Sequence, residues 1–248
     1  MEGLPTQVIY DLYVSKSGLI YLGTERGLVS FDGVRFLTYE FDDNLGFALN
    51  SIQEDEQGVI WCKNFANQIF KLEQNKLIQP DFVRKVLEDE ANNLIDFCVM
   101  GQEVYLLTEF NFFRLSPNKN PKIIVQEKNR KLENLFSALY NHPGKAYFEI
   151  TSLKNHYVVQ NDQLVKEMPV VKGQKETVMF QNELYYLVRG SKNELYELDT
   201  DQPFEEPFSK TPLFYRLDVA LSKLWLCTSS GVYPVDIAQK KILPGLFT

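Results

Sequence analysis

The chain has 248 residues, of which 44% are hydrophobic and 13% aromatic, and its formal net charge is −7. This length is sufficient for one large domain or two small ones with a sizeable core, and the acidic balance argues against a nucleic-acid or anionic-membrane surface. No apolar run approaches the roughly 18 residues of a membrane helix, and the opening MEGLPTQ is not a signal peptide. We therefore expect either a cytosolic protein or the part of a secreted protein that follows a removed signal.

Short apolar segments that alternate with polar residues recur along the whole chain, and a turn precedes each of them. Six of these segments carry an aromatic residue at a regular interval: Tyr21, Trp61, Tyr105, Tyr147, Tyr185 and Trp225. The interval from each aromatic to the next is about 40 residues, a period that is typical of repeat architectures. The longest interval separates Trp61 from Tyr105.

Each repeat predicts four short antiparallel strands. Turns such as SKSG at 15–18 and DEQG at 55–58 precede the aromatic segments, and another alternating run precedes each turn. After most of the aromatic segments come a third strand, a two-residue turn such as DG at 32–33 or ND at 161–162, and a fourth strand. Such residue pairs favour the positive φ of hairpin turns. The repeats therefore predict an all-β fold, a β-propeller of four-stranded antiparallel blades.

Six blades are predicted in a single domain that covers residues 1–248. Their approximate bounds are 8–42, 47–80, 93–127, 133–169, 175–209 and 212–248. A helical turn or two is expected only at 79–93, between the second and third blades, where the interval is longest. Two alternatives remain open: a propeller that closes with six blades, and a seven-bladed propeller that has been cut short.

The segment GLIYLGT at 18–24 is close to the phosphate-binding loop G-x-x-x-x-G-K followed by Ser or Thr. That loop requires a strand, a flexible turn, and then a helix whose N-terminus faces the phosphate. Here the strand continues through the segment, and Thr24 stands where lysine is required. We therefore reject a nucleotide site.

Residues that could carry catalysis or bind a metal are few. The two histidines, His142 and His156, have no further metal ligand at a suitable spacing, so no metal site is expected. The acidic clusters at 54–56, 88–90 and 205–206 fall in predicted turns or connections. We interpret these clusters as solvated surface and not as the paired carboxylates of a glycosidase, and no nucleophile elbow or Ser/His/Asp arrangement at recognisable spacing is present. We expect no cofactor, and we expect that this chain is not an enzyme.

The three cysteines lie in apolar, strand-like segments. They are Cys62, Cys98 and Cys227, and no two of them form a C-x-x-C pair. An odd number without paired spacing does not indicate a disulfide framework. We therefore predict three free, buried thiols.

The first repeat contains a longer motif. Its residues Gly18, Ile20, Gly23, Thr24, Gly27, Leu28, Phe31 and Asp32 fit the pattern D-x-x-G-x-I/L-W-x-G-T-x-x-G-L-x-x-F/Y-D/N. The second repeat keeps Asp55, Gly58, Ile60 and Trp61, and the sixth keeps Trp225, Thr228, Gly231 and Asp236. The chain thereby resembles the two-component regulator propellers, which are periplasmic sensor regions of bacterial, Bacteroidetes-like histidine kinases. The opening EGLP is similar to the start of such sensors.

This resemblance implies a periplasmic signal-input module, with the kinase downstream in the same chain. In a propeller the turns between second and third strands gather at one mouth of the central channel. Candidate contacts to a polar ligand, such as an oligosaccharide, are Arg26, Asn64, Asn111, His156 and Arg189. The alternatives are a protein-interaction scaffold without a small ligand, and a polysaccharide hydrolase or lyase. A homodimer is left open, and no nucleic-acid partner is expected.

Overall fold

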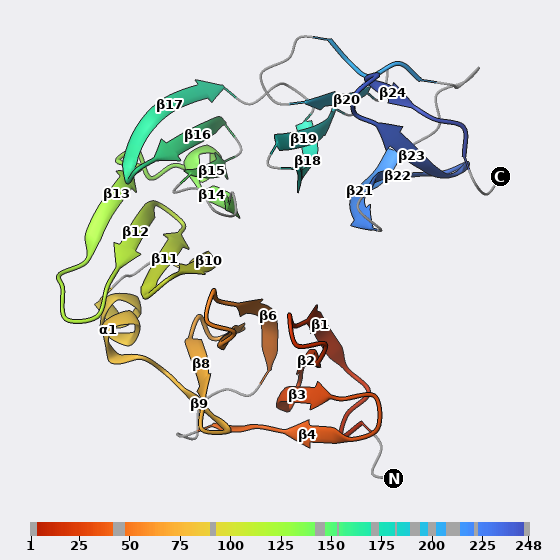
Figure 1. Ribbon diagram of the computed structural model, residues 1–248. Coiled ribbons are helices and arrows are strands. Elements are labelled where there is room, and N and C mark those ends of the chain that lie inside the picture. Colours follow the sequence, from red (N-terminus) through yellow and green to blue (C-terminus); the bar gives the residue numbers. More distant parts are fainter. Residues whose placement is uncertain are drawn as a thin grey trace. The chain divides into compact units, whose positions relative to one another are not determined.

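The computed structural model describes residues 4–41, 48–89, 93–141, 147–152, 154–169, 174–181, 183–188, 194–197, 202–206, 214–220 and 223–245. These residues form an all-β fold with one α-helix, and the chain divides into two compact units (Figure 1). The first unit contains Met1–Asn141 and Tyr147–Glu167, and the second contains the chain from Met168 to Thr248. That the two units form one domain stays a prediction.

The first unit contains four sheets, which we call blades one to four. Blade one consists of β1 (Ile9–Val14), β2 (Ile20–Thr24), β3 (Gly27–Phe31) and β4 (Phe36–Thr38). Blade two consists of β6 (Leu49–Glu54), β7 (Ile60–Asn64), β8 (Ile69–Glu73) and β9 (Lys76–Ile78), and β5 (Glu40–Phe41) adds to β9 in parallel. Blade three consists of β10 (Leu94–Met100), β11 (Glu103–Thr108), β12 (Asn111–Leu115) and β13 (Lys122–Gln126). Blade four consists of β14 (Phe136–Asn141), β15 (Tyr147–Ser152), β16 (Asn155–Gln160) and β17 (Gln163–Pro169), whose end passes into the second unit.

The second unit contains two sheets, blades five and six. Blade five consists of β18 (Gln174–Phe180), β19 (Glu183–Val188) and β20 (Glu194–Glu197). Blade six consists of β21 (Phe214–Ala220), β22 (Lys223–Thr228), β23 (Gly231–Asp236) and β24 (Lys241–Ile242). In every blade the neighbouring strands are consecutive in the chain, which is the strand order of propeller blades.

The predicted class, a β-propeller with four-stranded antiparallel blades, is confirmed, but the described residues contain five such blades and not six. Blade five has three described strands. The segment that follows β20 makes one backbone contact to it, from the Phe204 N–H to the Leu195 carbonyl at 2.9 Å. The next residue, Glu205, instead forms a parallel bridge to Lys241 at the edge of blade six. Its backbone groups are thereby used outside blade five, and the described residues of this blade contain three strands.

A β-bulge interrupts the first strand of each of the six described sheets at the same place. The pairing register shifts at residues 9/11, 49/51, 94/96, 136/138, 174/176 and 214/216. A bulge inserts one unpaired residue, bends the strand and increases its twist. Its recurrence at the sequence period confirms from the backbone that each repeat is one structural unit.

Five of the six repeat aromatics occupy equivalent positions, and the prediction for Tyr147 is wrong. Tyr21, Trp61, Tyr105, Tyr185 and Trp225 each lie three residues before the end of a second strand. In blade four this position belongs to Glu149, which pairs with Val158, whereas Tyr147 pairs with Gln160. The spacing of the aromatic residues does not predict this position correctly, because β15 ends at Ser152 and the residue three positions earlier is Glu149. Neither Tyr147 nor Phe148 lies there.

The core of the first unit lies between consecutive blades. In blade two, Leu49 and Ile52 flank the bulge of β6, and both are buried against residues of blade one that include Tyr21 and Leu28. Blades three and four repeat this arrangement with Leu94 and Phe97, and with Phe136 and Leu139. Burial of such a side chain contributes about 1.5–3 kcal/mol.

The equivalent apolar residues of blade one are exposed. Ile9 is 45% exposed and Leu12 is 57% exposed on β1. The same two positions are buried in blades two to four, where a preceding blade covers them. Blade one therefore presents an apolar face of the kind that other blades use for packing.

Helix α1 (Asp81–Asp89) confirms the helical segment predicted between blades two and three. It follows β9 directly and lies beside blade three in Figure 1. Its residues Val83 and Val86 are buried in the same cluster as Trp61. The helix thus joins the two blades and helps to cover the space between them.

Candidate functional site

Of the five predicted ligand contacts, Arg26 alone has an exposed side chain among the described residues. It lies in the turn between β2 and β3. Asn64 and Asn111 are buried at strand ends, and His156 is buried inside β16 and not in a turn. Arg189 lies outside the described residues.

Asn64 contacts Gln68 within the turn between β7 and β8, and Asn111 contacts Gln126 on the neighbouring strand β13. The Asn64 Nδ2 donates to Gln68 Oε1 at 2.7 Å, and Asn64 Oδ1 accepts from the Gln68 N–H at 2.8 Å. The Asn111 Oδ1 accepts from the Gln126 amide at 3.2 Å. Both side chains therefore hold blade edges in place, and a ligand role for them stays a prediction.

A recurrent side-chain hydroxyl, which was not predicted from the sequence, closes the turn between the second and third strands of several blades. A hydroxyl at the end of the second strand donates to the carbonyl three residues later, at 2.9–3.2 Å, in Thr24, Thr108, Ser152 and Thr228. Such local bonds stabilise turns. The available signal was a Thr three residues after the repeat aromatic, as at Tyr21, Tyr105 and Trp225.

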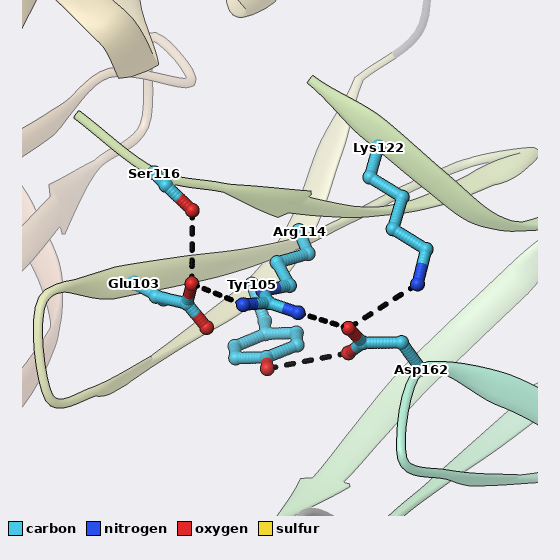
Figure 2. Close-up of polar contacts among 6 residues, drawn as sticks. All are labelled: Glu103, Tyr105, Arg114, Ser116, Lys122 and Asp162. Atoms are coloured by element: carbon cyan, nitrogen blue, oxygen red, sulfur yellow. Dashed lines mark hydrogen bonds and ion pairs between the residues drawn. The ribbon is translucent and has the colours of Figure 1, made fainter. Parts of the chain in front are cut away.

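A partly buried ionic cluster joins blades three and four (Figure 2). Asp162, in the turn between β16 and β17, reaches back to blade three and contacts Arg114 and Lys122. Its Oδ1 also accepts a hydrogen bond from the Tyr105 hydroxyl at 3.3 Å. Arg114 also pairs with Glu103. The cluster thus balances two cations with two carboxylates between the two blades.

The cluster changes the protonation behaviour of its members. Burial, the nearby Asp162 carboxylate and its hydrogen bond raise the pKa of Tyr105. Hydrogen bonds to Glu103 and Asp162 raise the pKa of Arg114. Desolvation works to raise the pKa of Glu103, but hydrogen bonds from Arg114 and Ser116 outweigh it, and the net shift is downward. The cluster therefore favours the charged forms of Arg114 and Glu103 and the neutral form of Tyr105.

A cavity of about 430 Å³ lies at the corresponding place between blades two and three. Its lining includes the first-to-second strand turn of blade two, the ends of β8 and β9, the first-to-second and third-to-fourth strand turns of blade three, and the start of α1. The lining residues are Asp55, Gln57, Val59, Trp61, Lys71, Glu73, Ile78, Pro80, Phe82, Gly101, Gln102 and Pro117. This size lies within the usual range of small-molecule sites, about 300–1,000 Å³. The cavity lies at the opposite end of the strands from the turn that holds Arg26.

The strand register shows that this cavity and the ionic cluster are equivalent places. Trp61 pairs with Lys71 in blade two, as Tyr105 pairs with Arg114 in blade three. On the next strand, Ile78 pairs with Lys71, whereas Lys122 pairs with Arg114. Blade two therefore has one cation where blade three has two, and an apolar residue at the second position.

The Trp61 side chain is held firmly in the cavity wall. Its Nε1 donates to Asp55 Oδ2 at 3.0 Å. Asp55 Oδ1 accepts from the backbone N–H groups of Gln57 and Val59, both at 2.9 Å. Lys71 Nζ lies 6.0 Å from the Trp61 ring centroid. The indole therefore has a fixed orientation.

The thiol predictions are confirmed in part. The three cysteines form no disulfide, and Cys62 and Cys98 are buried, but Cys227 is only half-buried. Among the described residues, no group of three potential metal ligands is present. No described helix is long and apolar enough to cross a bilayer.

Comparison with solved structures supports the fold over nearly the whole chain. The extracellular domain of the hybrid two-component system BT3049 from B. thetaiotaomicron is 15% identical, with a TM-score of 0.64, over 96% of this chain and 34% of that one. The corresponding domain of BT4673 is 13% identical, with a TM-score of 0.62, over 97% and 33%. These neighbours are extracellular domains of two-component systems, the class that the first repeat resembles, and this chain spans about a third of their length.

A propeller enzyme is also similar. Virginiamycin B lyase from Staphylococcus aureus is 11% identical, with a TM-score of 0.66, over 98% of this chain and 87% of that one. No family model and no curated protein matches the sequence. At these identities the comparisons establish a common fold and no common activity.

Proposed function

We propose that this chain is the extracytoplasmic, periplasmic signal-input module of a two-component histidine kinase, and that it binds a small polar ligand such as an oligosaccharide. The observation that supports this most is the similarity over 96% of the chain to a two-component sensor domain, together with the motif in blade one. The kinase is proposed to follow in the same chain.

The motif residues of blade one serve the architecture. Gly18 and Gly27 have positive φ values of 86° and 115°, which glycine adopts most readily. Gly23 faces the Leu49 carbonyl of blade two, and an added Cβ would lie 2.7 Å from that oxygen. The Asp32 Oδ1 accepts from the N–H groups of the following turn. The motif therefore supports a regulator-type propeller through its packing and says nothing about the ligand.

The lyase alternative is less well supported. The similar structure of virginiamycin B lyase is that of a catalytically inactive variant, in which alanine replaces a histidine. In the described part of this chain, the one histidine is His156, which is buried within β16. A protein-interaction scaffold without a small ligand is the second candidate.

A thermal-shift screen against oligosaccharides tests the sensor proposal. A ligand that binds only the folded state at 100 times its Kd stabilises it by about 2.7 kcal/mol, which raises Tm by several degrees. Arg26→Ala and Arg189→Ala test the predicted turn contacts. A gene that encodes neither a membrane segment nor a kinase with this chain would contradict the sensor proposal and leave the scaffold.

A further inference from the structure

We infer that the cavity between blades two and three, beside Trp61, is the ligand site, and that it receives an uncharged, hydroxylated ring such as a sugar ring. The inference rests on the proposed function and deepens it, because it moves the site from the turns that contain Arg26 to the opposite end of the strands. Nothing in the sequence motif points to this place.

The space between blades two and three differs from the equivalent space between blades three and four. Between blades three and four, Asp162 from the following blade fills the space and completes the pairing of Arg114 and Lys122. Between blades two and three, the corresponding turn contributes Pro117, and a cavity of about 430 Å³ remains beside the largely buried Trp61. The protein therefore closes one of these places with its own side chain and leaves the other accessible.

The charged groups that line the cavity are already paired within the protein. The Lys71 ammonium group is paired with Glu73 at 3.3 Å. The buried carboxylate of Asp55 accepts three N–H donors, from Gln57, Val59 and the Trp61 indole. An added carboxylate would meet two carboxylates, and an added ammonium group would find both carboxylates already satisfied by Lys71 and by the three N–H donors. A ligand without net charge avoids both conflicts.

The cavity lining combines aromatic side chains with hydrogen-bonding groups. Trp61 and Phe82 contribute rings, and Pro80 and Pro117 add apolar surface. Around them, the Gln57 and Gln102 amides can each donate and accept, and Lys71 and Glu73 add a donor and an acceptor. Apolar walls with a few polar groups are typical of small-molecule sites. A hydroxylated ring matches this lining, because its faces are apolar and its edge is polar.

The register offers a matched pair of variants for the test. Trp61 and Trp225 occupy the same position in their blades, and they are the two tryptophans of the chain. Trp225→Phe leaves Trp61 as the only fluorescent indole, and Trp61→Phe leaves Trp225. We expect a sugar to change the emission of the Trp225→Phe protein and not that of the Trp61→Phe protein.

The probes are methyl glucoside, methyl mannoside, methyl galactoside, maltose and cellobiose, with glucuronate as the charged comparison. Binding is measured by fluorescence titration and by thermal shift on the full chain. We expect Lys71→Met to weaken binding of the best neutral probe by about tenfold, the loss of one good hydrogen bond. Arg84→Met removes an exposed cation on α1 outside the cavity lining and should leave Kd unchanged.

Two of the possible results separate the cavity inference from the proposed function, and a third overturns both. If a neutral sugar binds and Arg26→Ala abolishes binding while Lys71→Met and Trp61→Phe do not, the cavity is the wrong site and the sensor proposal stands. If glucuronate binds more tightly than the neutral sugars at the cavity, the ligand class is wrong. If none of the probes binds, the inference is overturned together with the sugar-sensing part of the proposed function.

Discussion

Replacing Asp162 by asparagine should destabilise the first unit by about 2 kcal/mol, a cost between those of exposed and buried ion pairs. The Asp162 side chain is 8% exposed and contacts Arg114, Lys122 and Tyr105. Its φ is 58°, a left-handed conformation that asparagine tolerates, so the turn itself should survive. The substitution removes the charge and leaves the size of the side chain almost unchanged.

The magnitude follows from the exposure of the partners. Removal of one member of a fully buried ion pair costs about 3–5 kcal/mol, and an exposed pair contributes at most about 1 kcal/mol. Arg114 is 31% exposed and keeps Glu103, whereas Lys122 is 53% exposed. Because the partners are partly exposed, the cost of the substitution should lie between these two limits.

Urea unfolding measures this cost. A Trp225→Phe background leaves Trp61, which lies in the first unit, as the reporter. We expect a lower midpoint at an unchanged m value, because the surface exposed on unfolding stays the same. Glu73→Gln is the control, since its pair with Lys71 is half-exposed and should contribute at most about 0.5 kcal/mol. Equal effects of the two substitutions would refute the assignment of a stabilising role to the cluster.

The same cluster predicts an acid dependence. The folded-state pKa of Glu103 is lowered from its ordinary value of 4.5. A carboxyl group with a lowered pKa stabilises the fold fully above its unfolded-state pKa, and this stability is lost as the pH falls through the folded-state value. Stability of the first unit should therefore decrease below about pH 4.5, and Glu103→Gln should reduce that decrease.

Three further outcomes are expected. Gly23→Ala should lower the free energy of unfolding by about 1–3 kcal/mol in urea titrations, because its Cβ would lie 2.7 Å from the Leu49 carbonyl oxygen; an unchanged midpoint would count against this close approach. Cys62 should resist a thiol reagent in the native protein, since burial raises its pKa, while the half-buried Cys227 should react first; labelling at equal rates would contradict this. Burial raises the pKa of Tyr21 to about 12, so the stability that its protonated phenol provides should be lost as the pH rises between about 10 and 12. Ultraviolet titration of wild type against Tyr21→Phe checks this, and a phenolate that Tyr21 forms near the ordinary tyrosine pKa of 10.0 would disprove it.

The local pattern of the sequence determined the blades. Alternation of apolar and polar residues has the period of a strand, and it requires no knowledge of distant residues. Turn chemistry is equally local: Asn161 and Asp162 form the predicted two-residue turn between β16 and β17, and both have the positive φ that such a turn needs. Gly33 also has a positive φ, but its loop spans the four residues 32–35 and not the two predicted. The helix between blades two and three was predictable as well, because it interrupts the repeat at its longest interval.

Tertiary packing decided what lies between the blades. The position of Glu149 in place of an aromatic residue depends on where β15 ends, which the aromatic spacing did not reveal. The contact of Asp162 with Tyr105 joins residues 57 positions apart. Equally, Lys71 and Arg114 hold equivalent register positions, yet Arg114 pairs with Asp162 of the following blade, whereas Lys71 pairs with Glu73 of its own blade. A hairpin is determined by bonds between adjacent residues, whereas the side chains that meet between two sheets depend on how the sheets pack, so the cavity beside Trp61 became visible only in the structure.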